Sequence, residues 1–167
     1  MNAIANTTVI SNFAAVGRLD VLRSLFGQVR ISTDVYAEIQ DGRAEGCDFY
    51  DDIESCIHPL TPDGWLHLTT PTGDDELRLL GQLSSALHRG EATCLVIATH
   101  RGWAFLTADA LARKTARKLN VTTSGTLGIL TQAIKANLIS LDEANALLRQ
   151  MIEAGYRSPH GNLAELL

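Results

Sequence analysis

The chain has 167 residues, 46% of them hydrophobic and 20% charged, and its net charge is −5. This length fits one domain, residues 1–167, around one core, and the composition argues against a disordered chain and a membrane-spanning segment. The N-terminus lacks a basic segment followed by an apolar stretch, so we expect no signal peptide.

The three cysteines, Cys47, Cys56 and Cys94, are an odd and widely spaced set without a CxxC pair. This pattern argues against a disulfide framework and suits a reducing cytoplasm. Cys47 and Cys56 with His58 match no familiar spacing of zinc ligands, so we interpret them as ordinary thiols and an ordinary histidine. The acidic charge leaves open both a local basic stripe that binds RNA and an active site rich in carboxylates.

The first half of the chain alternates short strands with amphipathic helices. Residues 2–5 predict a strand that ends at Asn6. The following elements are predicted as a helix over 17–27 closed by Gly27, a strand over 29–32, helices over 33–42 and 47–57, and a strand over 64–73. Pro71 interrupts this last strand, which we expect to be an edge strand or a hairpin arm.

The second half continues the alternation. Residues 74–90 predict a helix with Leu77, Leu80, Leu83 and Leu87 on one face. The remaining elements are predicted as helices over 90–102, 108–120, 124–138 (capped by Ser124) and 140–155, and strands over 103–107 and 121–123. This order favours an α/β fold with a mostly parallel sheet and helices on both faces, in which ligands bind at the carboxyl ends of the strands.

Four residues are candidates for a site at that edge. Asn6 and Asp109 follow predicted strands, whereas Glu38 and Glu91 lie on helices that can point toward the same edge. Each also has a structural interpretation, as a helix cap or as a favourable charge in a helix. Carboxylates that converge raise each other's pKa unless a hard cation such as Mg²⁺ or Mn²⁺ neutralises them. Spacing alone leaves their convergence open.

Five segments, in this order, resemble the PIN-domain family and are similar to the VapC-type ribonuclease toxins of toxin–antitoxin modules. They are "ANTTVISNFAAVGRLDVL", "STDVYAEI", "GEATCLVIATHRGWAFLTAD", "VTTSGTLGIL" and "KANLIS". The resemblance implies a three-layer α/β/α fold and a cytoplasmic endoribonuclease that uses Mg²⁺ or Mn²⁺. It also implies an RNA substrate, a cognate antitoxin, a homodimer and no membrane association.

The resemblance also implies roles for individual residues. Glu38, Glu91 and Asp109 would hold the metal, and the hydroxyls of Thr7, Thr8 or Thr107 would orient a ligand or a water. The basic residues of the helix after Asp109 are candidates for contacts with the RNA backbone, although a solvated helix face explains them equally well: Arg113, Lys114, Arg117 and Lys118. The "SGTLG" turn is a weaker candidate for binding a phosphate at a helix start.

The chain departs from the family pattern at Asn6, where the first acid of the family is Asp. The amide keeps a carbonyl oxygen but removes one negative charge, which should impair catalysis more than folding. Three explanations remain: an engineered inactive variant, a natural module that binds RNA or an antitoxin without cleaving, and an active enzyme that tolerates the amide. We favour the first, because the rest of the motif is intact. A flavodoxin-like nucleotide-binding domain is set aside, since "NTTVISN" lacks glycine.

Overall fold

A computed structural model describes residues 1–167 except Ser84. The described residues form one six-stranded sheet in the order β3-β4-β2-β1-β5-β6, and every neighbouring pair is parallel. The strands are β1 (Ala3–Ala5), β2 (Val29–Ser32), β3 (Ile57–His58), β4 (Leu66–Thr69), β5 (Ala104–Leu106) and β6 (Thr123–Ser124). The predicted α/β fold with a parallel sheet is confirmed.

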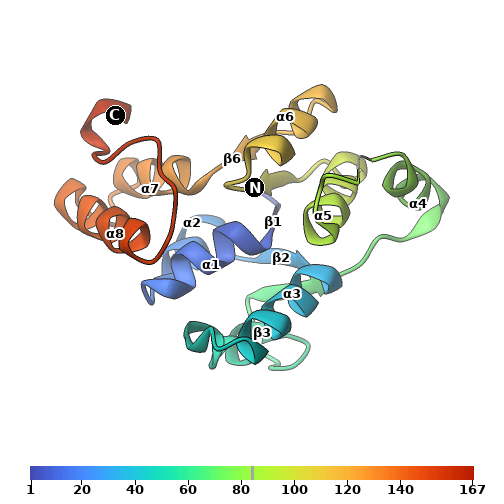
Figure 1. Cartoon of the computed structure of the whole chain (residues 1–167), viewed down its shortest axis with the longest axis horizontal. Helices are drawn as coiled ribbons and strands as arrows, with labels where there is room; N and C mark the ends of the chain where they lie inside the picture. Colours follow the sequence, from blue (N-terminus) through green and yellow to red (C-terminus); the bar gives the residue numbers. More distant parts are fainter. Residues whose placement is uncertain (84) are drawn as a thin grey trace.

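Helices cover the sheet on both faces. They are α1 (Thr7–Ala15), α2 (Leu19–Phe26), α3 (Thr33–Ala44), α4 (Gly73–Gln82), α5 (Arg89–Arg101), α6 (Ala110–Lys118), α7 (Thr126–Lys135) and α8 (Leu141–Glu153). Helices α7 and α8 lie beside α1 and α2, whereas α4 and α5 lie on the other side of β1 (Figure 1). The three-layer α/β/α arrangement follows from this distribution. No helix among the described residues is long and apolar enough to cross a membrane.

The central strands carry the core. All residues of β1 and β5 are buried, and β1 pairs with β2 on one side and with β5 on the other. The chain leaves β1 toward β2 but leaves β5 toward β6, so the two connections diverge from neighbouring strands. Open parallel sheets bind ligands at such a divergence, outside the carboxyl ends of the strands. Asn6 and Asp109 follow these two strands.

The helix predicted over 47–57 is wrong. The structure has two short 3₁₀ helices, at Asp48–Tyr50 and Ile53–Cys56, followed by β3. Ile57 pairs with Leu66 of β4, so the sheet draws this backbone out of a helical path. The close approach depends on Gly64, because a Cβ there would lie 2.3 Å from the backbone nitrogen of His58.

Two further predictions need correction. Strand β4 is neither an edge strand nor a hairpin arm: it lies between β3 and β2 and is parallel to both, so its ladder bonds are made on both sides. The helix predicted over 74–90 ends at Gln82, and the extended backbone of Leu83 follows. The expected leucine face is therefore broken: Leu77 is 54% exposed, and Leu87 is buried but lies outside the helix.

The turn before α7 also differs from the prediction. Ser124 belongs to β6 because the strand pairs Leu106 with Ser124, and Gly125 is the N-cap of α7. The predicted strand over 121–123 is thus shifted toward the C-terminus. The helices predicted over 17–27, 33–42, 90–102, 108–120 and 140–155 are present with small shifts at their ends. Gly27 and Gly102 end two of them with positive φ angles, as glycine allows.

Candidate active site

Asn6 is a helix cap whose amide oxygen and amide nitrogen both form hydrogen bonds. It follows β1 in extended conformation and is 1% exposed. Its Oδ1 accepts from the Thr8 hydroxyl at 2.8 Å and from the backbone N–H of Val9 at 3.4 Å. Its Nδ2 donates to Thr107 Oγ1 at 2.8 Å. The side chain therefore joins the start of α1 to the end of β5, and its carbonyl has no lone pair to spare.

Glu38 is held from two sides. It projects from the second turn of α3, and its Oε1 accepts the backbone N–H of Gly90 at 2.9 Å. Its Oε2 accepts the hydroxyl of Thr7 at the start of α1. Gly90 allows this close approach, because a Cβ at that position would come within 2.7 Å of both carboxylate oxygens and would displace them. The carboxylate is thereby brought against the first turn of α5.

Glu91 lies in the first turn of α5 and is 6% exposed. Its Oε2 accepts the backbone N–H of His88 at 3.0 Å, as in a capping box. Burial raises the pKa of Glu91, the His88 bond opposes that rise, and the negative charges of Asp109 and Glu38 add to it. Glu91 therefore lies in the electrostatic field of both other carboxylates.

Asp109 is the N-cap of α6. Its Oδ1 accepts the backbone N–H of Ala112 at 2.7 Å, while its own backbone N–H donates to Thr107 Oγ1 at 3.1 Å. Thr107 is fully buried and contacts both Asn6 and Asp109, the residues that follow the two central strands. The Thr8 hydroxyl accepts the backbone N–H of Ala108 at 3.1 Å. These hydroxyls fix the two strand ends relative to each other.

One cavity of about 260 Å³ opens among these groups. It is lined by Asn6, Thr7, Thr8, Glu38, His88 and Glu91. Asp109 is outside this lining, although its charge reaches Glu91. Sequence reasoning missed His88, whose position three residues before Glu91 fits a capping box and was the available signal.

The carboxylates of this site have no lysine or arginine partner in the described part of the chain. No Lys or Arg there forms an ion pair with Glu38, Glu91 or Asp109. Arg89, at the start of α5, pairs with Asp34 at 2.9 Å instead. Three carboxylates that supply oxygen ligands and lack a neutralising charge fit a hard divalent cation in donor type and in charge.

The positions of the side chains fit such an ion less closely. Among the described residues, no three His, Cys, Asp or Glu side chains form a group that could hold a metal ion. That statement covers Glu38, Glu91 and Asp109, and also Cys47, Cys56 and His58. The acids of the site are instead spread along the strand ends, each carboxylate accepting hydrogen bonds from the first turn of a helix or from its hydroxyls. The donor chemistry fits a cation, but no enclosing cage is formed.

The four basic residues of α6 are not one surface. Lys114, Arg117 and Lys118 are exposed. Arg113 is partly buried and turns toward Gly125, where a Cβ would lie 2.8 Å from its Nη1. Arg113 forms no ion pair with Asp109, although the two lie one helical turn apart. The structure therefore separates Arg113 from the other three.

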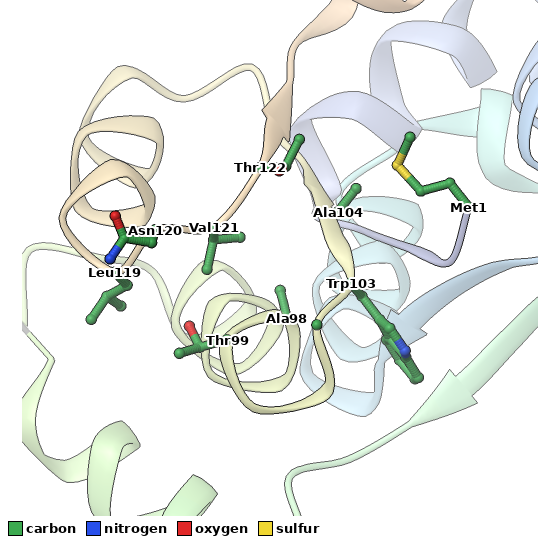
Figure 2. A pocket seen from close by; sticks show the side chains of 10 residues that line it. Met1, Ala98, Thr99, Trp103, Ala104, Leu119, Asn120, Val121 and Thr122 are labelled. Carbon is green, nitrogen blue, oxygen red and sulfur yellow. The ribbon is translucent and has the colours of Figure 1, made fainter.

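Another cavity, of about 330 Å³, lies at the opposite edge of the sheet. Met1, Trp103 and Thr122 are among its lining residues (Figure 2). None of its lining residues carries an acidic or basic side chain. Of these two cavities, the one at the carboxyl ends of the strands is the one lined by acidic side chains.

Comparisons with known proteins bear on the family of the chain. No curated protein sequence matches the chain. Among solved structures, the chain is similar to a PilT N-terminus domain protein from the hyperthermophilic archaeon Sulfolobus solfataricus P2, with 12% identity, a TM-score of 0.49 and coverage of 96% of this chain and 100% of that one. A family model described as a PIN domain matches residues 2–167. The chain therefore belongs to the PIN-domain family.

Proposed function

We propose that this PIN domain is a metal-dependent endoribonuclease of the VapC toxin type, impaired in this form by Asn6. PIN domains are generally nuclease-like, which gives the class of reaction. The observation that carries the proposal is the set of three carboxylates, Glu38, Glu91 and Asp109. They come from three separate helices near the carboxyl ends of β1 and β5 and have no lysine or arginine partner among the described residues.

Glu38, Glu91 and Asp109 would hold Mg²⁺ or Mn²⁺. When bound, the ion supplies Lewis acidity toward a phosphate oxygen and lowers the pKa of a water. Each carboxylate keeps accepting capacity for this role: a carboxylate has about four lone-pair sites, and only one or two of them are used here.

The hydroxyls of the site position the acids. Thr7 and the N–H of Gly90 fix the carboxylate plane of Glu38 from two directions. Thr107 holds the backbone of Asp109, and Thr8 holds that of Ala108. Because these donors are anchored on α1, β5 and α5, the acids need little reorganisation to meet a substrate.

Asn6 explains the impairment. Its carbonyl oxygen already accepts two hydrogen bonds, and its NH₂ group cannot face a cation. An aspartate there would keep the cap with one oxygen and would present the other to the Thr107 hydroxyl, which can donate in place of accepting. The exchange adds one negative charge with almost no change of shape, so the local fold tolerates either residue.

The test is the substitution Asn6→Asp. We expect RNA cleavage that depends on Mn²⁺ or Mg²⁺, is abolished by a chelator and exceeds that of the present chain by about two orders of magnitude, the scale of losing a group that stabilises transition-state charge. Asn12→Asp is the matched control, since Asn12 lies in the same helix but bonds to Thr126, away from the acids. Equal inactivity of folded Asn6→Asp and Asn12→Asp proteins would contradict the proposal and favour a non-catalytic module that binds RNA or an antitoxin.

The partners are part of the same proposal. We propose a homodimer and a small antitoxin whose segment covers the acidic cavity. Light scattering of the purified chain measures the first. The second predicts that the antitoxin encoded beside this gene protects Thr7 and Thr8 amides from hydrogen exchange. A monomer at high protein concentration would contradict the homodimer. Unchanged hydrogen exchange of Thr7 and Thr8 would contradict the antitoxin segment.

A further inference from the structure

A small cavity of about 130 Å³ adjoins the acids at the carboxyl ends of β5 and β6. Its lining includes Ala108, Arg113, Gly125, Tyr156 and Arg157. We call this cavity the arginine pocket. It brings together side chains from α6, the start of α7 and the segment after α8, so the fold rather than one stretch of sequence creates it.

Arg113 occupies an electrostatically unfavourable place in this pocket. Its guanidinium lies against Gly125, the N-cap of α7, where a Cβ would come within 2.8 Å of Nη1 and would displace it. The N-terminus of a helix carries a partial positive charge, so a cation there is repelled unless an anion lies nearby. Its side chain makes no hydrogen bond or ion pair with any described residue, and Asp109, one turn away, does not take that role.

Arg157 adds a second positive charge to the same cavity. It is exposed, and its guanidinium likewise has no hydrogen bond or ion pair among the described residues. Tyr156 also lines the cavity, where burial raises its pKa and the positive charge of Arg113 opposes that rise. The arginine pocket thus concentrates positive charge with no compensating carboxylate.

We propose that the arginine pocket binds one phosphate group of an RNA strand whose neighbouring phosphate lies at the acids. This inference rests on the proposed function. Guanidinium groups form paired hydrogen bonds with phosphate oxygens, and two of them meet at a cavity with room for a single such group. Ala108 connects the two places, because it lines the arginine pocket and its N–H bonds to Thr8 of the acidic cavity.

The acids and the arginine pocket interact differently with the phosphates of the RNA strand. The acids repel a phosphate in the absence of a cation, whereas the arginine pocket attracts one at all times. The pocket therefore anchors the backbone before and after the reaction. This role also separates Arg113 and Arg157 from Lys114, Arg117 and Lys118, which contribute only to the general field of α6.

The experiment measures binding without cleavage. A fluorescent oligoribonucleotide with 2′-O-methyl groups is titrated against the full chain in chelator, at several salt concentrations, with Arg113→Ala, Arg157→Ala and the control Arg149→Ala. Arg149 is an exposed arginine of α8 outside the pocket. We expect each pocket variant to bind about tenfold more weakly and to lower the slope of log affinity against log salt by about 0.7, while Arg149→Ala changes neither appreciably. Circular dichroism confirms folding, and Arg157, being exposed, is the safer variant.

A second arm uses inorganic phosphate as the probe. We expect phosphate to raise the melting temperature of the chain, to compete with the oligonucleotide, and to lose both effects in Arg113→Ala. Pocket variants that bind the oligonucleotide like Arg149→Ala overturn the pocket but leave the proposed function standing. Phosphate stabilisation that requires Arg113, in a chain that binds no oligonucleotide, supports a phosphate pocket of another source and overturns both its RNA assignment and the proposed function.

Discussion

Two glutamates of this molecule share the same local setting but have opposite electrostatics. Glu76 and Glu91 each lie in the first turn of a helix, α4 and α5, and each is 6% exposed. Each accepts a backbone N–H from just before its helix, Glu76 from Thr72 at 2.6 Å and Glu91 from His88 at 3.0 Å. Both carboxylates are therefore little exposed and accept the N–H of the residue that caps their helix.

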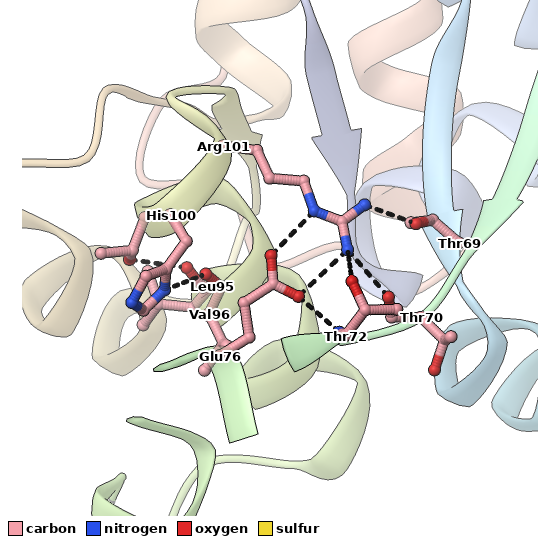
Figure 3. Close-up of polar contacts among 9 residues, drawn as sticks. Thr69, Thr70, Thr72, Glu76, Leu95, Val96, His100 and Arg101 are labelled. Atoms are coloured by element: carbon pink, nitrogen blue, oxygen red, sulfur yellow. Dashed lines mark hydrogen bonds and ion pairs between the residues drawn. The ribbon is translucent and has the colours of Figure 1, made fainter. Parts of the chain in front are cut away.

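The two glutamates differ in that Glu76 is paired with a guanidinium group, that of Arg101. Arg101 donates to Glu76 through Nε at 2.8 Å and through Nη2 at 3.0 Å, and these bonds lower the pKa of Glu76 despite its burial (Figure 3). The same arginine bonds to Thr69 at the end of β4. Glu91 has no such partner among the described residues, and its pKa is raised. A buried carboxylate with its own cation holds helices together, whereas one without a cation is suited to bind something from outside.

The substitution Arg101→Ala removes the cationic partner of Glu76. It leaves the Glu76 carboxylate buried and unpaired and frees the end of β4, so we expect the free energy of unfolding in urea to fall by about 3 kcal/mol. Arg78→Ala is the matched control in α4, because the Arg78–Asp75 pair is 67% and 77% exposed, and its loss should stay within about 0.5 kcal/mol. Equal losses for the two variants would show that Glu76 is not stabilised by its partner.

The substitution Glu91→Gln tests the charge of the glutamate that has no arginine partner. Glutamine still accepts the His88 N–H but removes the repulsion from Asp109 and Glu38, so we expect the metal-free chain to gain about 1 kcal/mol in unfolding free energy. We also expect Mn²⁺ to stabilise the unaltered chain, and the variant to lose most of that stabilisation. Glu45→Gln, at an exposed position, should do neither. A destabilised Glu91→Gln protein would mean that Glu91 has a structural role only.

The sequence predicted the parts of this molecule that local patterns determine. Asn6, Glu38, Glu91 and Asp109 follow or face strand ends as expected, because parallel strands place their carboxyl ends at one edge. The gathering of Asn6, Glu38 and Glu91 around one cavity depends on the packing of α1, α3 and α5, which no spacing encodes. The metal role of these acids stays a prediction.

The failures have the same origin. Residues 47–57 follow a helical pattern of apolar side chains, yet Ile57 pairs with β4. This pairing depends on the tertiary structure and not on the local pattern. The separation of Arg113 from its basic neighbours also depends on a distant contact, with Gly125. The pairing of Glu76 is likewise invisible to local patterns, because its partner Arg101 lies 25 residues away along the chain. Long-range pairs of this kind decide which acids are paired and which are free.

The smallest expected effect, the pH dependence of Glu76, tests the paired side of the comparison. Because the folded-state pKa of Glu76 lies below its ordinary value of 4.5, the carboxylate stabilises the fold above that value and loses this contribution as the pH falls through the folded-state pKa. The unaltered chain should therefore lose more stability than Glu76→Gln between about pH 6 and pH 3, measured by urea unfolding. Parallel curves for the two proteins would show that Arg101 does not favour the charged form. A steeper loss of unfolding free energy in the unaltered chain would show that the Glu76–Arg101 pair, which has no counterpart at Glu91, causes this part of the acid sensitivity.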